Sequence, residues 1–173
     1  MNYFLLLIAF AAGPWTESVD VYHDEDKCVS YQARIDGSYL VIKATLGPNW
    51  HTYSIDNKVR AEEKLAGKEI LGIDQPTRIT LTGGLSATGG WLQTPPKDMS
   101  KPALNWFSWG YETEAVFVTK VKGSGPTKIG IRGQSCNATS CRNVDTAIEL
   151  PAATLTSETG LDLKALIPVR EKR

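Results

Sequence analysis

Short stretches of alternating apolar and polar residues, separated by glycine and proline, constrain the fold of this chain most strongly. Residues 28–35 alternate as a half-buried strand does, with one face formed by Val29, Tyr31, Ala33 and Ile35. Asp36-Gly37 is a hairpin turn signal, and residues 39–46 supply the second strand. The 173 residues include 15 Gly and 9 Pro, a content that favours many short strands over long helices.

Further strands are predicted along the rest of the chain, at residues 50–53, 76–82, 112–122, 127–135 and 144–150. One helix is predicted at residues 58–67 and a short helix around 161–167, before a charged end at 170–173 that is expected to fray. Strands of this length with turn signals between them are typical of a β-sandwich. The sequence therefore predicts an all-β sandwich with minor helical pieces.

Residues 83–110 form a long segment rich in glycine, proline and aromatic residues. Its Gly-Gly and Pro-Pro pairs disfavour regular structure, yet it carries Trp91, Trp106, Phe107 and Trp109. Long loops are uncommon unless they are packed or functional. The aromatic residues at 106–109 are either part of the core or part of a binding surface.

An apolar run at residues 4–12 is too short to span a bilayer, which needs about 20 residues. It fits the apolar region of a secretory signal peptide, although no Lys or Arg precedes it. Cleavage motifs lie at 9–11 and 16–18, of which the second is preferred; the alternative for the run is a buried first strand. We expect a signal peptide at 1–18, a β-sandwich domain at 19–153 and a tail at 154–173, without stable membrane insertion after processing.

The charges balance, with 19 Lys plus Arg and 19 Asp plus Glu. This argues against binding to nucleic acid through bulk charge. Only two histidines are present, so no metal centre built on several histidines is expected.

Three cysteines carry most of the chemical information. Cys136 and Cys141 form a C-x4-C element between two predicted strands, where paired strands would bring them within disulfide range. The spacing leaves a redox role, a structural hairpin disulfide and metal binding open. Cys28 is left over; a strand cysteine of this kind is most often a buried, inert thiol, and a bond to another chain or a reactive thiol are the alternatives.

Residues 40–142 contain an ordered series of motifs, which runs Trp50-His51-Thr52-Tyr53, Pro76-Thr77-x-Ile79, Gly90-Trp91, Pro95-Pro96, Gly110-Tyr111-Glu112 with Ala115-Val116-Phe117, and Gly133-Gln134-Ser135-Cys136 to Cys141. This series resembles the N-terminal, immunoglobulin-like domain of the DsbD family of thiol:disulfide interchange proteins. The resemblance implies an immunoglobulin-like β-sandwich in the periplasm. In that family the domain passes electrons from a membrane-embedded donor to thioredoxin-like proteins by dithiol–disulfide exchange, under an aromatic cap loop.

The resemblance also implies roles for particular residues. Cys136 and Cys141 match the redox pair, with Cys141 the cysteine attacked in mixed disulfides. Phe107, Trp109 and Gly110 fall where the cap loop is expected. His51 and Tyr53 fall on a strand beside the pair, where an imidazolium would lower the pKa of a thiol.

Two features depart from the family pattern. Arg142-Asn143 stands where many relatives have a Pro-Pro pair. No multi-span membrane domain and no thioredoxin-like C-X-X-C domain is present in the sequence, so a membrane electron donor is expected to act in trans.

The expected function is periplasmic thiol:disulfide interchange with thioredoxin-like exported proteins, without a small-molecule cofactor. The alternative is a non-catalytic β-sandwich binding module with a structural hairpin disulfide, whose contact surface would be formed by Trp91, Trp106 and Trp109. Whether the chain is an oxidoreductase stays open at this point.

Overall fold

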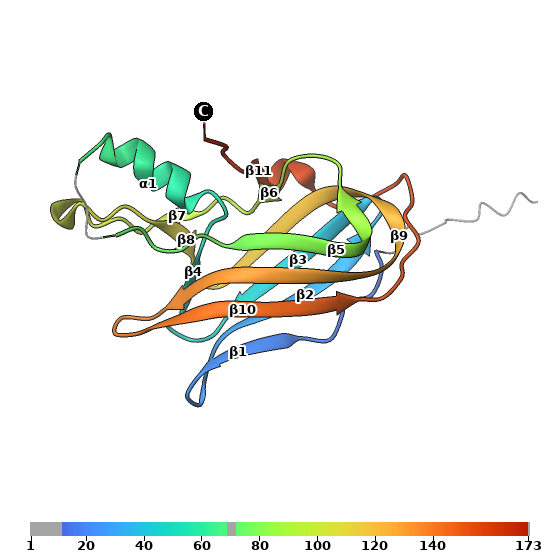
Figure 1. Cartoon of the computed structure of the whole chain (residues 1–173), viewed down its shortest axis with the longest axis horizontal. Coiled ribbons are helices and arrows are strands. Elements are labelled where there is room, and N and C mark those ends of the chain that lie inside the picture. Colours follow the sequence, from blue (N-terminus) through green and yellow to red (C-terminus); the bar gives the residue numbers. More distant parts are fainter. Residues whose placement is uncertain (1–11, 69–71, 173) are drawn as a thin grey trace, which may run out of the picture.

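Eleven antiparallel strands make up half of residues 12–68 and 72–172, the part of the chain that the computed structural model describes (Figure 1). The strands are β1 (Val19–His23), β2 (Asp26–Asp36), β3 (Tyr39–Leu46), β4 (His51–Tyr53), β5 (Arg78–Ala87), β6 (Leu92–Gln93), β7 (Lys97–Asp98), β8 (Trp109–Tyr111), β9 (Glu114–Cys136), β10 (Cys141–Leu150) and β11 (Ile167–Pro168). The helical pieces are α1 (Asn57–Leu65) and the 3-10 turns η1 (Pro102–Leu104) and η2 (Leu163–Ala165). The predicted all-β class with minor helical pieces is confirmed.

The strands form two layers that share the long strand β9. The first half of β9 pairs with β3 and β6, whereas its second half pairs with β10 and β4. Strand β5 pairs with β9 on both sides of the bend, from Val121 to Arg132. The sequence predicts two separate strands here, at 112–122 and 127–135. The structure instead runs one strand through the bend, where Gly123 and Gly125 take φ values of 107° and 105° that other residues rarely adopt.

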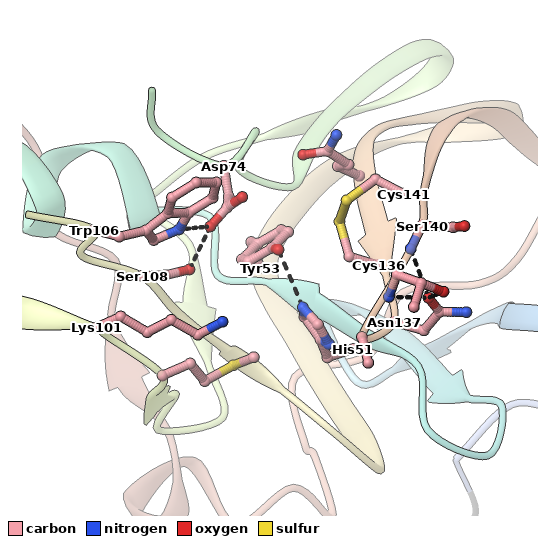
Figure 2. A pocket seen from close by; sticks show the side chains of 14 residues that line it. His51, Tyr53, Asp74, Lys101, Trp106, Ser108, Cys136, Asn137, Ser140 and Cys141 are labelled. Atoms are coloured by element: carbon pink, nitrogen blue, oxygen red, sulfur yellow. Dashed lines mark hydrogen bonds between the residues drawn. A yellow bond between two sulfur atoms is a disulfide. The ribbon is translucent and has the colours of Figure 1, made fainter. Parts of the chain in front are cut away.

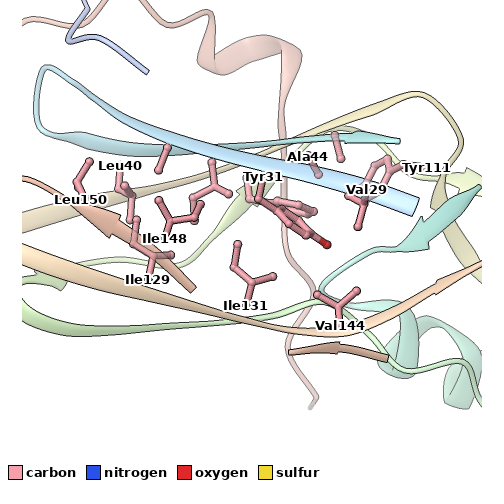
Figure 3. Packing of buried hydrophobic residues seen from close by; sticks show 14 of the residues in the cluster. Val29, Tyr31, Leu40, Ala44, Tyr111, Ile129, Ile131, Val144, Ile148 and Leu150 are labelled. Atoms are coloured by element: carbon pink, nitrogen blue, oxygen red, sulfur yellow. The ribbon is translucent and has the colours of Figure 1, made fainter. Parts of the chain in front are cut away.

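The core lies between these layers. Figure 3 shows Tyr31 of β2 and Leu40 of β3 facing Ile129, Ile131 and Ile148 of β9 and β10. These side chains are at most 1% exposed. The alternating pattern of β2 thus points the apolar face into the sandwich, as the sequence predicts.

Both ends of the described chain pack onto the sandwich. The Gly13 and Thr16 backbone amides donate to the carbonyl oxygens of Ile35 and Ala33. The predicted signal peptide lies mostly outside the described residues, which begin at residue 12. At the other end the prediction of a frayed terminus is wrong for Arg170, which donates its backbone amide to Asp56 and its guanidinium to Glu63.

Helix α1 begins at Asn57 and ends at Leu65, close to its predicted bounds. It ends because Ala66 adopts a left-handed conformation and Gly67 follows it. The helix contacts β8 and buries Arg60, Ala61 and Leu65. Within the described residues, no helix is long and apolar enough to cross a membrane.

Candidate functional site

The β9–β10 hairpin ends in the turn that carries both cysteines of the C-x4-C element. Cys136 and Cys141 are direct partners in the β9–β10 ladder and form a disulfide. Asn137 shapes the turn between them, because its side-chain oxygen accepts the backbone amides of Thr139 and Ser140. The local sequence therefore places the two sulfurs across the mouth of the hairpin.

The two cysteines differ in their access to solvent. Cys136 is 2% exposed, whereas Cys141 belongs to the exposed residues. Cys136 is covered because β4 pairs with this end of β9, with His51 directly opposite Cys136. Cys141 is therefore the more exposed residue of the pair.

Strand β4 forms the floor of the site. Thr52 and Ser135 tie β4 to β9: the Thr52 hydroxyl donates to the Gln134 carbonyl and the Ser135 hydroxyl to the His51 carbonyl. On the same strand, the His51 Nε2 and the Tyr53 hydroxyl lie 3.1 Å apart in a hydrogen bond. The sequence prediction that His51 and Tyr53 fall beside the cysteine pair agrees with this placement.

Burial controls the charge of both floor residues. The pKa of His51 is lowered, chiefly because burial disfavours the charged ring. The neutral imidazole therefore predominates at pH 7. The pKa of Tyr53 is raised by burial and by the nearby carboxylate of Asp74, so the phenol keeps its proton.

A segment on the opposite side completes a cleft of about 450 Å³ (Figure 2). Asp74 accepts hydrogen bonds from the Trp106 indole nitrogen at 2.7 Å and from the Ser108 hydroxyl at 2.9 Å. The cleft is lined by His51, Tyr53, Asp74, Met99, Lys101, Trp106, Ser108 and residues 134 and 136–141. The disulfide thus lies in one wall, and Trp106 and Ser108 lie in the other.

The residues predicted as a cap loop do not themselves line the cleft, although Phe107 lies between the lining residues Trp106 and Ser108. The lining of this cleft, among the described residues, does not include Phe107, Trp109 or Gly110. Trp109 is 8% exposed and donates its backbone amide to the Asn57 side chain. Gly110 lies against β4, where a Cβ atom would come within 2.1 Å of the Thr52 carbonyl oxygen. Their role as a cap stays a prediction.

Cys28 is a free thiol in β2 and is 0% exposed. Burial raises its pKa above the ordinary value, so it carries little thiolate. The expectation of a buried cysteine is confirmed.

The sequence interpretation missed Asp74, Met99, Lys101 and Ser108 as cleft residues. Asp74 is 8% exposed, and a buried carboxylate usually has specific partners, but its partners follow more than 30 residues later in the chain. No local pattern marks that contact. Within the described residues, no group of at least three His, Cys, Asp or Glu side chains is arranged to hold a metal ion.

Comparison with solved structures supports the fold. The N-terminal periplasmic domain of ScsB from Proteus mirabilis has a TM-score of 0.54 and 18% identity, over 81% of this chain and 53% of that chain. This chain therefore spans about half of that structure. The N-terminal domain of DsbD from Neisseria meningitidis, in its reduced form, aligns with a TM-score of 0.38 and 14% identity, over 92% of this chain and 91% of that one.

No protein-family model matches the chain, and no curated protein sequence matches it. The predicted resemblance to N-terminal domains of this type is confirmed for the fold, an immunoglobulin-like β-sandwich, by the ScsB structure. At this level of identity the likeness does not extend to residue roles.

Proposed function

We propose that this domain exchanges its Cys136–Cys141 disulfide with the thiols of thioredoxin-like proteins in the periplasm. The observation that carries the proposal is the position of the disulfide in the wall of an open cleft, with Cys141 exposed and Cys136 buried. Thiol–disulfide exchange depends on access to a sulfur atom. A disulfide that only stabilised the sandwich would gain more by linking distant strands than by closing a turn with a sequence separation of 5.

The exposure of Cys141 supports an order for the exchange. A partner thiolate attacks the Cys141 sulfur, so a mixed disulfide forms and Cys136 leaves as a thiolate that takes up a proton. A second partner thiolate then attacks the partner sulfur of the mixed disulfide and releases the Cys141 thiolate, which is protonated in turn. The partner dithiol is oxidised to a disulfide, and this domain gains two electrons and two protons.

His51 supports the leaving group in this scheme. It lies directly opposite Cys136 in the β4–β9 ladder, and its ring is hydrogen-bonded to Tyr53. A neutral imidazole can donate a hydrogen bond to a buried thiolate, which would otherwise be poorly solvated. Run in reverse, the same steps pass the two electrons of the reduced domain to the disulfide of an oxidised thioredoxin-like protein, and a membrane donor in trans is proposed to reduce the Cys136–Cys141 disulfide again.

Trapping with single-cysteine variants tests the proposal. Cys136→Ser leaves the exposed Cys141 free, and this variant is expected to form mixed disulfides with an oxidised thioredoxin-like protein. Cys141→Ser leaves only the buried Cys136 and is the matched control, for which little mixed disulfide is expected. Equal trapping by both variants, or by neither, would contradict the proposed order of attack.

The reduction potential tests the redox role itself. Equilibration with glutathione should give a value of about −180 to −270 mV, the range of exchange proteins. A value well below about −300 mV is typical of structural disulfides and would leave the binding module as the better description.

The structure offers less support for that alternative. Its proposed contact surface combines three tryptophans, but Trp109 is 8% exposed and Trp91 packs against the core. Trp106 lines the cleft beside the disulfide. These three side chains therefore do not form one exposed surface.

A further inference from the structure

The far wall of the cleft is a projecting segment, residues 99–108, which we call the tip segment. It leaves the sandwich after β7 and returns at β8, which pair with each other through Lys97–Gly110 and Asp98–Trp109. Within the segment, the Met99 amide donates to the Ser108 carbonyl and the Lys101 amide to the Trp106 carbonyl. Residues 101–105 are all exposed. The tip segment is thus a hairpin extension surrounded largely by solvent.

Within the described residues, Asp74 supplies the hydrogen bonds that tie the tip segment to the rest of the protein, apart from the bond that the Ser100 amide donates to Asp98 in the adjoining strand β7. One carboxylate oxygen, Oδ2, accepts both the Trp106 indole N–H and the Ser108 hydroxyl. Hydrogen bonds to an ionised acceptor are stronger than neutral ones. Loss of this single side chain would leave the segment held by its own hairpin.

Asp74 is itself held in place from a second direction. Its backbone carbonyl accepts the side-chain amide of Asn57, which is fully buried at the start of α1. The side-chain oxygen of Asn57, Oδ1, accepts the backbone N–H of Trp109, which is the first residue of β8 after the tip segment. The Asn57 side chain therefore joins the start of α1, the backbone of Asp74 and the first residue of β8 to one another.

We propose that Asp74 is a positioning residue that holds the tip segment as the far wall of the cleft and thereby favours protein thiols over small thiols. The inference rests on the proposed function. Cys141 is exposed without any movement of the tip segment, so a small thiol needs no second wall. A protein that presents its cysteine on an extended segment fills the cleft and contacts Trp106 and Met99 opposite the disulfide. A fixed wall lowers the ordering cost of that contact.

The double variant Trp106→Phe/Ser108→Ala tests this inference. It removes both hydrogen-bond donors to Asp74 and keeps an aromatic ring in the wall. Trp15→Phe is the matched control, because Trp15 lines a different pocket near Leu150, at the end of β10 away from Cys141. Asp74→Ala removes the acceptor instead and should behave like the double variant.

Two measurements are made on each variant in its oxidised form. Amide hydrogen exchange reports whether the tip segment is still held, without any reference to redox function. Rate constants for reduction by dithiothreitol and by reduced thioredoxin report how fast the disulfide reacts with a small thiol and with a protein thiol. Thermal unfolding confirms that each variant is folded.

We expect faster amide exchange in residues 99–108 and a fall of about tenfold in the ratio of the thioredoxin to the dithiothreitol rate constant, the factor that corresponds to 1.4 kcal/mol. The Trp15→Phe protein should match the wild type in both measurements. Unchanged exchange, or an unchanged ratio in a reactive protein, overturns the role of Asp74. If dithiothreitol reduces the wild-type protein but thioredoxin does not, the proposed function is overturned. The proposed preference for protein thiols is then overturned as well.

Discussion

Replacing Asp56 by alanine is expected to destabilise the domain by about 3–5 kcal/mol. This is the range observed when one partner of a buried ion pair is removed and the other charge stays buried. Asp56 is 1% exposed and precedes helix α1. Its Oδ1 accepts hydrogen bonds from Ser54, Arg60 and Gln93 at 2.8–2.9 Å, and its Oδ2 accepts the backbone amide of Arg170. One carboxylate thus joins α1, β6 and the C-terminal tail.

The size of the effect follows from the groups that lose their partner. Arg60 is 8% exposed and Gln93 is 0% exposed, so water cannot readily replace the carboxylate. Asp145→Ala is the matched control, because Asp145 also pairs with an arginine Nε, that of Arg132, but both side chains are at least 70% exposed. Exposed pairs of this kind contribute about 0–1 kcal/mol.

Urea unfolding of the two variants and the wild type at pH 7 measures the difference. The reasoning requires a large loss for Asp56→Ala, a small one for Asp145→Ala and similar m-values for all proteins. Losses of equal size, or a loss below about 1 kcal/mol for Asp56→Ala, would refute it.

The pH dependence gives the same prediction an independent check. Burial raises the pKa of Asp56, but hydrogen bonds from Arg60, Arg170, Gln93 and Ser54 outweigh burial, so the pKa lies below its ordinary value. A lowered folded-state pKa adds stability that is present above the unfolded value of about 3.9 and is lost as the pH falls through the folded value. The gap between wild type and Asp56→Ala should therefore narrow below about pH 4.

Three further predictions concern other parts of the chain. Gly110→Ala should cost about 1–3 kcal/mol in urea unfolding, because a Cβ there would lie 2.1 Å from a carbonyl oxygen of β4, whereas Gly89→Ala, with open space around it, should be near neutral. Cys28, 0% exposed, should not react with a thiol reagent in the native protein and should react after denaturation; modification of the native protein would contradict its burial. If the chain is exported as proposed, mass spectrometry should show cleavage after Ala11 rather than at the preferred motif 16–18, because the amides of Gly13 and Thr16 hydrogen-bond to β2; a mature chain that begins at Val19 would contradict this.

Patterns between neighbouring residues predicted much of the fold. The alternation in residues 28–35 and the Asp36-Gly37 turn lead directly to the β2–β3 hairpin, with Asp36 opposite Tyr39. The cysteine spacing leads to the β9–β10 hairpin. Both hairpins depend on interactions between residues that are close in sequence, so a short stretch of sequence is enough to predict them.

Features that depend on distant residues were not predictable in this way. The continuity of β9 through Gly123 and Gly125 depends on a strand distant in sequence, β5, which pairs with β9 on both sides of the bend. From composition alone, two glycines this close together predict a loop and not a continuous strand. Likewise, the bond from Asp74 to Trp106 spans 32 positions, and no periodic pattern connects the two. The far wall of the cleft was therefore predicted only in part: the sequence singled out Trp106 but not Asp74, which holds it.

The unequal exposure of the two cysteines follows from the topology of the sheet rather than from their spacing. Cys136 ends β9, which has β10 on one side and, at this point, His51 of β4 on the other. Cys141 begins β10, which within the described residues pairs with β9 alone. An edge strand leaves one side of each residue open to solvent or to a partner. A disulfide between an interior strand and an edge strand therefore joins one buried and one exposed cysteine, and the order of thiol attack proposed above rests on that difference in strand position.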